Sequence, residues 1–350
     1  MSGTRLREPA RESAEARPPA ARTGRLSAYG ERYGLVLLLV GVIAFFSVLP
    51  ASSTAFTSTA NVQSVLASIA VVAVLAVAAV FPLACGQFDF SVAATSLVSS
   101  IVCAATISNH DAPLPLAVLC GVGAGVLVGL VNAVLVALLR LNAFVITIGT
   151  ATLLPGLVQW YTQGVDLVRG ISQPLRDFGS LTWLGLPRVI WLVALITAVC
   201  WFTLAHTAFG RRLYAVGSNA SAARLVGIPV TTLTFGALVT SGGLAGIAGV
   251  ILTARNGGGL VDSGADLLFP ALAAVFLGAT AIDPGRYNVL GAVVGTLFVA
   301  VSVSGLTLAG TAEWVPAVFN GAALIVAVAV STLLARRRGG PLAGARQGNR

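Results

Sequence analysis

The sequence contains no lysine and few charged residues of any kind. Charged residues make up 9% of its 350 residues, whereas hydrophobic residues make up 57%. A soluble domain carries about 25% charged residues, so this chain has too few to cover a surface exposed to water. We infer that its solvent is a lipid bilayer. Without lysine the chain also lacks a phosphate-binding loop of the G-x-x-x-x-G-K-[ST] type, which excludes an ATP site of that kind.

Metal ligands and nucleophiles are equally scarce. The only two histidines are His110 and His206, and the four cysteines lie in or beside apolar runs without metal-ligand spacing. Cysteines in such places are typical of small core residues. Neither G-x-S-x-G nor H-E-x-x-H occurs. We therefore expect no metal site, no cofactor bound by this chain and no enzymatic activity of its own.

What the sequence does contain is a series of apolar runs long enough to cross a membrane. They lack the strict alternation of barrel strands, so helices are the structure that satisfies their backbone in lipid. The sequence predicts an all-α polytopic membrane protein of about ten transmembrane helices, some of them broken or re-entrant, in runs at 34–50, 62–84, 90–108, 113–139, 143–160, 189–208, 230–254, 267–281, 288–309 and 314–335. The run at 267–281 is short and contains Pro270, so whether it spans or re-enters stays open at this point.

Polar segments flank the transmembrane domain, which we place at 34–335. Residues 1–33 are rich in Arg, Ala and Pro and have the composition of a disordered tail. A cleaved signal peptide is disfavoured, because the charged region is too long and no A-x-A site follows Leu49. Residues 336–350 form a second, basic tail. We expect both tails to be cytoplasmic.

The net charge of +9 comes from arginines that lie in loops beside the apolar runs. This placement is typical of membrane orientation by the positive-inside rule and does not indicate nucleic-acid binding. With the N-terminus inside, seventeen of the 21 arginines fall on the cytoplasmic side and four on the outer side. An even number of crossings, with both termini cytoplasmic, fits this bias.

One acidic residue, Asp89, is flanked by apolar sequence on both sides. It lies in the segment 86–91 between the second and third runs, after Gly86. A carboxylate at membrane depth is costly and usually marks a transport pathway or a paired site, and Gly86 permits a helix break that lines a cavity. Alternatively, Asp89 is an N-cap for the helix that follows. The two interpretations are compatible, and both stay open.

The longest loop between runs on the inner side, 209–229, has the pattern of a short capped helix. Asn219 or Ser218 is a suitable N-cap, residues 220–226 are mostly helix formers, Gly227 suits the left-handed C-terminal position and Pro229 prevents continuation. So short a helix needs external packing. We interpret it as a docking element for another protein, with a passive connector on the membrane surface as the alternative.

Small and hydroxylated residues recur inside the runs. Glycines spaced by four at 121–129, 242–246 and 291–295 predict close helix packing. Thr147, Thr150 and Thr152 place hydroxyl groups in the fifth run, where they either line a polar path or bond back to their own helix.

Four stretches of the chain resemble a known family, the ribose/xylose-type sugar permease subunits of bacterial ATP-binding-cassette importers. The family patterns G-G-x-D-L-S-V-G, L-[AP]-x-[FI]-[IV]-x-T-[LI]-G-T, G-x-N-x-x-A-A-x-x-[SA]-G-[IV] and A-x-A-A-V-x-[LI]-G-G-T are similar, in this order along the chain, to residues 86–93, 141–150, 217–228 and 271–280. The likeness covers about 35–335. Among the departures are Gln87, Phe90 and Ala93 in place of glycine, leucine and glycine, so the identity of the cargo is left open.

The resemblance implies two sets of functional residues. The first would line the translocation pathway and comprises Gln87, Phe88, Asp89, Phe90, Ser91, Asn142, Thr147 and Thr150. The second would couple the chain to an ATPase and comprises Gly217, Asn219, Ala222, Ala223, Arg224 and Gly227. From the residues alone, we expect Arg224 to meet a carboxylate of the partner, with Ala222 and Ala223 permitting close approach.

The resemblance also implies a complex in the bacterial cytoplasmic membrane. Two permease subunits, as a homodimer or heterodimer, would form the pore. A cytoplasmic ATPase that uses ATP and magnesium would dock on 209–229, and an extracytoplasmic substrate-binding protein would deliver the cargo. The residues leave open an ion-coupled secondary transporter, the same importer class with a branched-chain amino acid or nucleoside as cargo, and a non-transporting scaffold.

Overall fold

The computed structural model describes residues 25–337, and this part of the chain is almost entirely helical. Each of the ten predicted apolar runs contains one of its long or medium helices: α1 (Arg25–Val48), α3 (Thr59–Ala84), α4 (Val92–Ser108), α5 (Leu114–Ala133, continued by a π-helical turn at Val134–Leu138), α6 (Ala143–Thr162), α8 (Arg188–His206), α11 (Val230–Asn256), α12 (Leu268–Gly278), α13 (Val289–Leu308) and α14 (Trp314–Arg337). The all-α prediction is confirmed.

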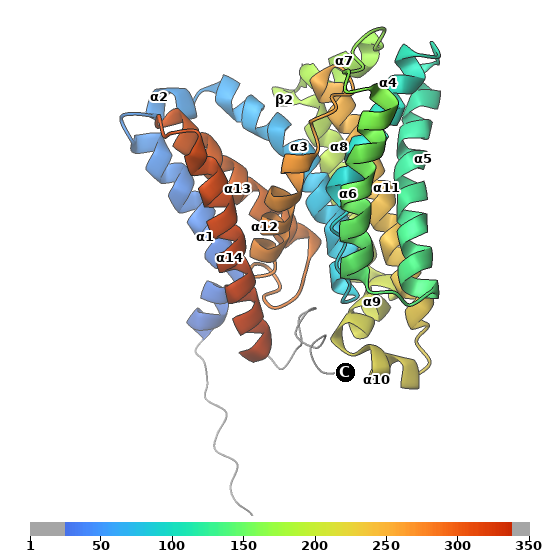
Figure 1. The fold of residues 1–350 in the computed structure, drawn as a ribbon. Coiled ribbons are helices and arrows are strands. Elements are labelled where there is room, and N and C mark those ends of the chain that lie inside the picture. Colours follow the sequence, from blue (N-terminus) through green and yellow to red (C-terminus); the bar gives the residue numbers. More distant parts are fainter. Residues whose placement is uncertain (1–24, 338–350) are drawn as a thin grey trace, which may run out of the picture.

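The remaining elements are short and lie at the two ends of the bundle (Figure 1). One end carries α2 (Ser53–Phe56), α7 (Gln173–Ser180) and a hairpin of β1 (Thr182–Trp183) and β2 (Leu186–Pro187), and the other carries α9 (Ala208–Ser218) and α10 (Ala220–Leu225). We call these the α7 end and the α10 end. Among the described residues, α1 begins and α14 ends at the α10 end, as an even number of crossings requires.

The predicted boundary of the N-terminal tail is wrong. Because α1 begins at Arg25, residues 25–33 belong to a helix, whereas we had placed them in a disordered tail. The helix begins before the apolar run does, because most of the polar residues that precede residue 34 are compatible with helix. The second predicted tail, 336–350, likewise begins inside a helix, because α14 runs to Arg337. The remaining parts of the two predicted tails, 1–24 and 338–350, lie outside the described residues.

Within residues 25–337, seven helices are long and apolar enough to cross a membrane, whereas α4, α12 and the apolar part of α1 (Arg32–Val48) are shorter. The shortest of these three is α12. Its eleven residues reach about 17 Å, roughly half of a hydrocarbon core about 30 Å thick. The chain before it supplies the rest of the crossing. Gly259 pairs with Leu167 at the α7 end, and beyond α12 the Ile282 amide donates to the Arg32 carbonyl at the α10 end. Residues 257–278 are therefore one broken crossing. It consists of non-helical chain, a 3-10 turn (Ala265–Leu267) and then the short helix α12.

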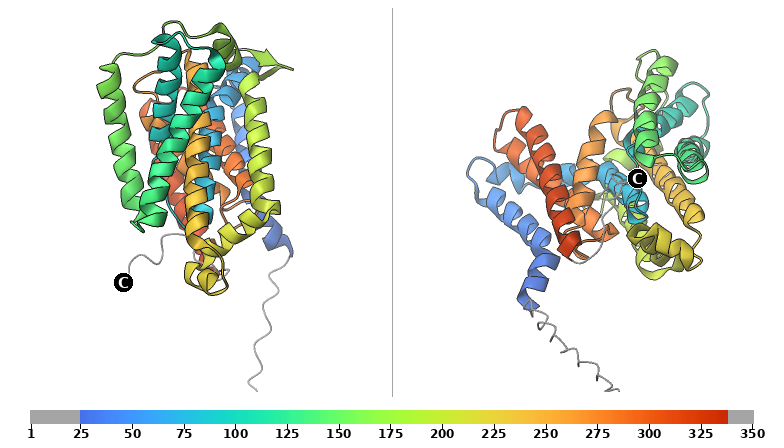
Figure 2. Two further views of the ribbon diagram at one scale, coloured as in Figure 1. Left: turned by 90° about the vertical axis from the view of Figure 1, so that its right-hand side faces the viewer. Right: turned by 60° about the horizontal axis from the view of Figure 1, so that its bottom comes forward.

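The core is centred on α3, which lies between two groups of helices (Figures 1 and 2). Helices α1, α13 and α14 are on one side of it, and α4, α5, α6 and α11 are on the other. Residues 69–84 of α3, mostly Ala and Val, are buried except for the partly buried Val72, as expected of a helix that is apolar all round.

Glycines hold α5 against α11 at close range. A Cβ at Gly125 would lie 2.5 Å from the Cα of Gly246, and one at Gly242 would lie 2.6 Å from the Cα of Gly129. Only a residue without a side chain permits this approach, so the predicted packing role of these glycines is confirmed.

Candidate translocation and coupling sites

The turn between α3 and α4, residues 85–91, holds Asp89 in the interior of the bundle. The carboxylate is 5% exposed. Its Oδ1 accepts hydrogen bonds from the Ser91 amide (3.0 Å) and the Ser91 hydroxyl (2.6 Å), and its Oδ2 accepts one from the Ser241 hydroxyl of α11 (2.8 Å). The N-cap interpretation of Asp89 is wrong, because α4 begins at Val92 and Ser91 occupies the cap position; Asp89 instead orders the residue before the helix by accepting from Ser91. It is also a buried carboxylate between helices, as the pathway interpretation required.

Further hydrogen bonds extend from Asp89 across the bundle. The side-chain amide of Asn132 on α5 donates to the Ser91 hydroxyl at 2.9 Å. Its carbonyl oxygen accepts from the Thr150 hydroxyl of α6 at 2.8 Å. We call Asp89, Ser91, Asn132, Thr150 and Ser241 the polar network. It joins the 85–91 turn to α5, α6 and α11, three helices distant from it in sequence.

Sequence reasoning missed two members of this network, Asn132 and Ser241. Asn132 is 1% exposed and is the sole amide within the apolar stretch of α5. An amide in such a run is a detectable signal, because burying it without partners is costly. Ser241 carries no comparable signal, since serine is common in membrane helices and usually bonds to its own backbone.

The other predicted pathway residues have separate roles. The Thr147 hydroxyl lies within hydrogen-bond distance of the Phe88 carbonyl (3.3 Å) and the Ala143 carbonyl (2.8 Å), so it contacts the turn without joining the network. Asn142 is exposed, and its side-chain oxygen caps α6 by accepting from the amides of Phe144 and Val145. The structure therefore does not bring Asn142 to the turn.

Two phenylalanines of the turn form an aromatic layer beside Asp89. Phe88 and Phe90 stack with ring centroids 5.8 Å apart. Phe88 also stacks on Phe276 of α12, and Phe90 meets Phe144 of α6 edge to face. These contacts pack the turn against α6 and α12. Gln87 is partly buried, and its backbone amide donates to the Pro82 carbonyl.

At the α10 end, both predicted caps of the short helix are confirmed. The Asn219 side chain accepts from the amides of Ser221 and Ala222, each at 3.1 Å. Gly227 has φ +80°, and the bonds from Ile228 to Ala223 and from Gly227 to Arg224 form a Schellman motif. α10 ends at Leu225, one residue before the predicted end. The same loop also contains α9, a helix that we did not predict.

The faces of α10 correct one prediction. Ala223 is 4% exposed and belongs to the main core, so it anchors the helix to its own chain and does not offer a surface to a partner. Ala222 and Arg224 are exposed, as expected. The most prominent outward side chains are apolar, because Leu225 is 89% exposed and Val226 75%.

The two predicted sets of residues meet at a pair of glycines. A Cβ at Gly217 of α9 would lie 2.2 Å from the Ala84 carbonyl oxygen, and one at Gly86 would lie 3.5 Å from the Cα of Gly217. The backbone of α9 therefore rests directly on the backbone of the 85–91 turn. A displacement of α9 must move the turn that holds Asp89, because interiors this closely packed transmit strain.

The described residues carry no cluster of three or more His, Cys, Asp or Glu side chains that could hold a metal ion. In the network each Asp89 oxygen is already engaged by neutral donors, with no base poised to activate a nucleophile. A multi-crossing helical bundle with a buried polar network is an arrangement that membrane transport proteins use.

Comparison with known sequences places the chain within that class. A family model described as "Branched-chain amino acid transport system / permease component" matches residues 61–328. The chain belongs to this family of permeases. It is thus a transporter subunit and not an enzyme.

Individual relatives are similar over nearly their whole length. The ribose import permease protein RbsC of Bacillus subtilis is 31% identical, covering 87% of this chain and 92% of the relative. RbsC of Haemophilus influenzae is 28% identical, with coverages of 85% and 93%. The L-arabinose ABC transporter permease protein AraH of Azospirillum brasilense is 30% identical, with coverages of 89% and 90%. The resemblance to sugar permeases is confirmed. No solved structure matches the chain.

Proposed function

We propose that this chain is the membrane-spanning subunit of an ATP-binding-cassette importer that carries a monosaccharide across a bacterial cytoplasmic membrane. The names of its relatives, which include ribose and L-arabinose permeases as well as autoinducer 2 import permeases, support the importer class, and the ribose and L-arabinose permeases support the cargo. The observation that carries the mechanism is the contact of Gly217 with Ala84 and Gly86, because it links a projecting cytoplasmic segment to the buried turn.

The chemistry around Asp89 favours a hydroxylated cargo. The polar network consists of hydroxyl, amide and carboxylate groups, which exchange hydrogen bonds readily with sugar hydroxyls. A branched-chain amino acid would bring a carboxylate that needs a cationic partner, and the polar network as defined above contains no arginine or histidine. An ion-coupled transporter would place paired ionisable residues at this depth, whereas Asp89 pairs only with serines.

The distribution of charge supports an orientation with the α10 end in the cytoplasm. Among the described side chains, that end carries one exposed acidic residue, Asp283, and the buried Asp89, together with Arg32, Arg140, Arg211, Arg212, Arg224 and Arg286. The α7 end carries arginines 169, 176, 188 and 255 balanced by Asp111, Asp166, Asp177, Asp262 and Glu313. The positive-inside rule then makes both termini cytoplasmic.

In this arrangement α10 is the docking element for the ATPase. Leu225 and Val226 offer an exposed apolar contact and Arg224 a charge, while Ala223 fixes the helix to the core. ATP and magnesium are bound by the partner and not by this chain. A second permease subunit completes the pore, and an extracytoplasmic binding protein delivers the sugar to the α7 end.

The test combines co-purification with transport. Leu225→Asp should abolish co-purification of the ATPase from the native membrane and stop ATP-driven uptake of ribose or arabinose into vesicles, because a charge replaces the most exposed apolar side chain of α10. The matched control is Leu184→Asp, since Leu184 is 75% exposed in the hairpin at the opposite end. Failure to recover any ATPase with the unmodified chain, or uptake of leucine in place of sugars, would contradict the proposal.

A further inference from the structure

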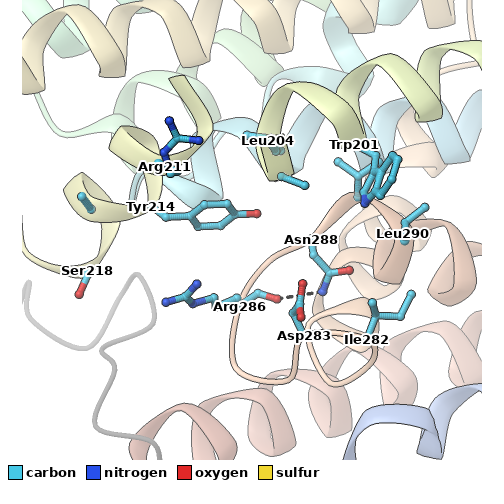
Figure 3. A pocket seen from close by; sticks show the side chains of 13 residues that line it. Trp201, Leu204, Arg211, Tyr214, Ser218, Ile282, Asp283, Arg286, Asn288 and Leu290 are labelled. Atoms are coloured by element: carbon cyan, nitrogen blue, oxygen red, sulfur yellow. Dashed lines mark hydrogen bonds between the residues drawn. The ribbon is translucent and has the colours of Figure 1, made fainter. Parts of the chain in front are cut away.

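A cavity of about 510 Å³ opens at the α10 end, apart from the polar network (Figure 3). One side is formed by Arg211, Tyr214 and Ser218 of α9, and the other by the 282–290 segment that leads into α13. Trp201 and Leu204 of α8 close it on the membrane side. We call this space the headgroup pocket.

Most polar atoms of the headgroup pocket are already hydrogen-bonded. Tyr214 donates its hydroxyl to the Tyr287 carbonyl at 2.6 Å, and burial raises the pKa of this phenol to about 12, so it remains a neutral donor. The side-chain amide of Asn288 donates to the backbone carbonyls of Gly278, Ala281 and Arg286, and its side-chain oxygen accepts from the backbone amide of Gly291. These groups build the wall of the pocket and leave little free capacity for a ligand.

The charged side chains are the groups left for a ligand. Arg211 donates one bond, to the His206 carbonyl, and Arg286 lies 5.9 Å from the centre of the Tyr214 ring. Within the part of the chain that the structure describes, neither guanidinium forms an ion pair. The opposing charge in the pocket is Asp283, so the lining carries two positive groups and one acceptor. A phosphodiester that also bears hydroxyl groups complements this set.

An apolar groove of about 470 Å³ continues from the headgroup pocket toward the α7 end. It runs between α3, α8 and α13, and Trp201 and Leu290 line both spaces. Its lining is almost wholly hydrocarbon and extends along α8 from Trp201 to Ile190. Those eleven helical steps amount to about 16 Å, close to one leaflet of a hydrocarbon core about 30 Å thick. The combined space thus has a charged end and an apolar end one leaflet long.

We propose that the headgroup pocket and the groove together bind one anionic phospholipid of the cytoplasmic leaflet, of the phosphatidylglycerol kind. The phosphate lies against Arg211 and Arg286, the glycerol hydroxyls donate to Asp283, and an acyl chain fills the groove beside Ala194 and Ala198. Basic pockets between helices at this membrane face are suited to anionic headgroups. The site uses the orientation proposed above but none of the residues of the polar network or of α10.

A lipid in this place would act on the coupling segment. Its headgroup would contact α9 and the 282–290 segment, which already meet through the bond from Tyr214 to Tyr287. Since Gly217 at the end of α9 touches the 85–91 turn, a ligand that fixes α9 also restrains the turn. We therefore expect ATP-driven uptake to depend on anionic lipid, with half-maximal uptake at a lower phosphatidylglycerol content in the unmodified chain than in pocket variants.

The test measures bound lipid directly, on the complete importer. Native mass spectrometry of the complex from nanodiscs with equal phosphatidylglycerol and phosphatidylcholine should show retained phosphatidylglycerol. The double variant Arg211→Gln with Arg286→Gln should retain at least about tenfold less, a ratio that corresponds to about 1.4 kcal/mol. Ala198→Trp, which fills the groove without touching a charge, should lose the lipid as well.

Two controls and two outcomes decide the matter. Val199→Trp introduces the same tryptophan side chain at a neighbouring exposed position outside the groove, and Arg140→Gln removes a charge from the same membrane face outside the pocket; both should retain the lipid. Equal retention of the two phospholipids by the unmodified chain would overturn the proposal. So would binding that survives Ala198→Trp and is displaced by inorganic phosphate, because the site would then take a free phosphate and not a lipid.

Discussion

Asp89 shows how a carboxylate is kept inside a membrane bundle. Its two oxygens accept three hydrogen bonds, from the amide and hydroxyl of Ser91 and from the hydroxyl of Ser241. Hydrogen bonds to a charged acceptor contribute about 1.5–3 kcal/mol each to stability. A buried carboxylate without such bonds would destabilise the fold by the free energy of its desolvation. The serines and Asn132 therefore offset much of the desolvation of the charge and hold it at one place between α4, α5 and α11.

At this scale we predict the effect of removing the charge. Asp89→Asn keeps an acceptor for the Ser91 amide, so the amount of protein in the membrane should remain close to that of the unmodified chain. Uptake into vesicles should fall by about tenfold or more, equivalent to about 1.4 kcal/mol in the barrier. Asp111→Asn, in a loop at the α7 end, is the control. Unchanged uptake for Asp89→Asn would show that Asp89 serves only to order α4.

A second residue-scale prediction concerns the contact of α9 with the turn. Gly217→Ala places a methyl group where it would collide with the Ala84 carbonyl, so α9 must shift at a cost of about 1–3 kcal/mol. We expect ATP hydrolysis to continue while uptake falls, since the segment still binds the ATPase but no longer rests on the turn. Gly149→Ala, with nothing within 4 Å of the added methyl, should leave both activities unchanged.

At the scale of an element, α10 combines local and tertiary stabilisation. Its six residues are too few to be stable alone, so the caps at Asn219 and Gly227 and the burial of Ala223 hold it in place. The consequence is a short helix that projects from the end of the bundle (Figure 2), with exposed side chains at Leu225 and Val226. A rigid element is what a coupling role requires, because both subunits must share its movement.

The C-terminal cap of α10 allows a sharp test. Gly227→Val forces a β-branched residue into φ +80°, which costs about 1–2 kcal/mol and disturbs the end of the helix. We expect normal insertion but reduced co-purification of the ATPase, or hydrolysis without uptake. Gly310→Val is a matched control, because Gly310 has φ +79° and equally open surroundings at the α7 end. Normal values for Gly227→Val in both assays would remove the coupling role.

At the scale of the whole molecule, the broken crossing at 257–278 determines the topology. If this segment returned to the side it came from, α13 and α14 would be inverted and the C-terminal arginines would lie outside. The links from Leu167 to Gly259 and from Arg32 to Ile282 place its two ends on opposite sides of the bundle. Non-helical chain within the membrane is tolerated where protein covers it, and here Leu97 of α4 packs against Gly264 in the non-helical part of the crossing.

Reporter fusions test this topology. A reporter fused after Gly258 should be active outside the cell, and reporters fused after Arg286 or after Arg338 should be active in the cytoplasm. The pair at 258 and 286 isolates the broken crossing, because no other transmembrane segment lies between them. Activity of both on one side would mean that the segment re-enters, and an external signal after Arg338 would contradict cytoplasmic termini.

Much of this architecture follows from local sequence. Ten apolar runs become ten helices because in lipid each segment must satisfy its own backbone, so length and hydrophobicity suffice to locate it. The caps of α10 were equally accessible, since Asn219 and Gly227 act within a few residues of themselves. The family could also be recognised from four short stretches, because these stretches keep residue types at fixed spacing.

Only the tertiary structure decided which polar groups meet. Asn132 and Ser241 reach the 85–91 turn from far along the chain, and nothing local to either specifies that partner. The same holds for Ala223, which faces the core although its sequence neighbours are exposed, and for the contact between Gly217 and Gly86. These features depend on how each helix is rotated and on which helix lies beside it, and that is set by packing between distant segments and not by the residues nearby.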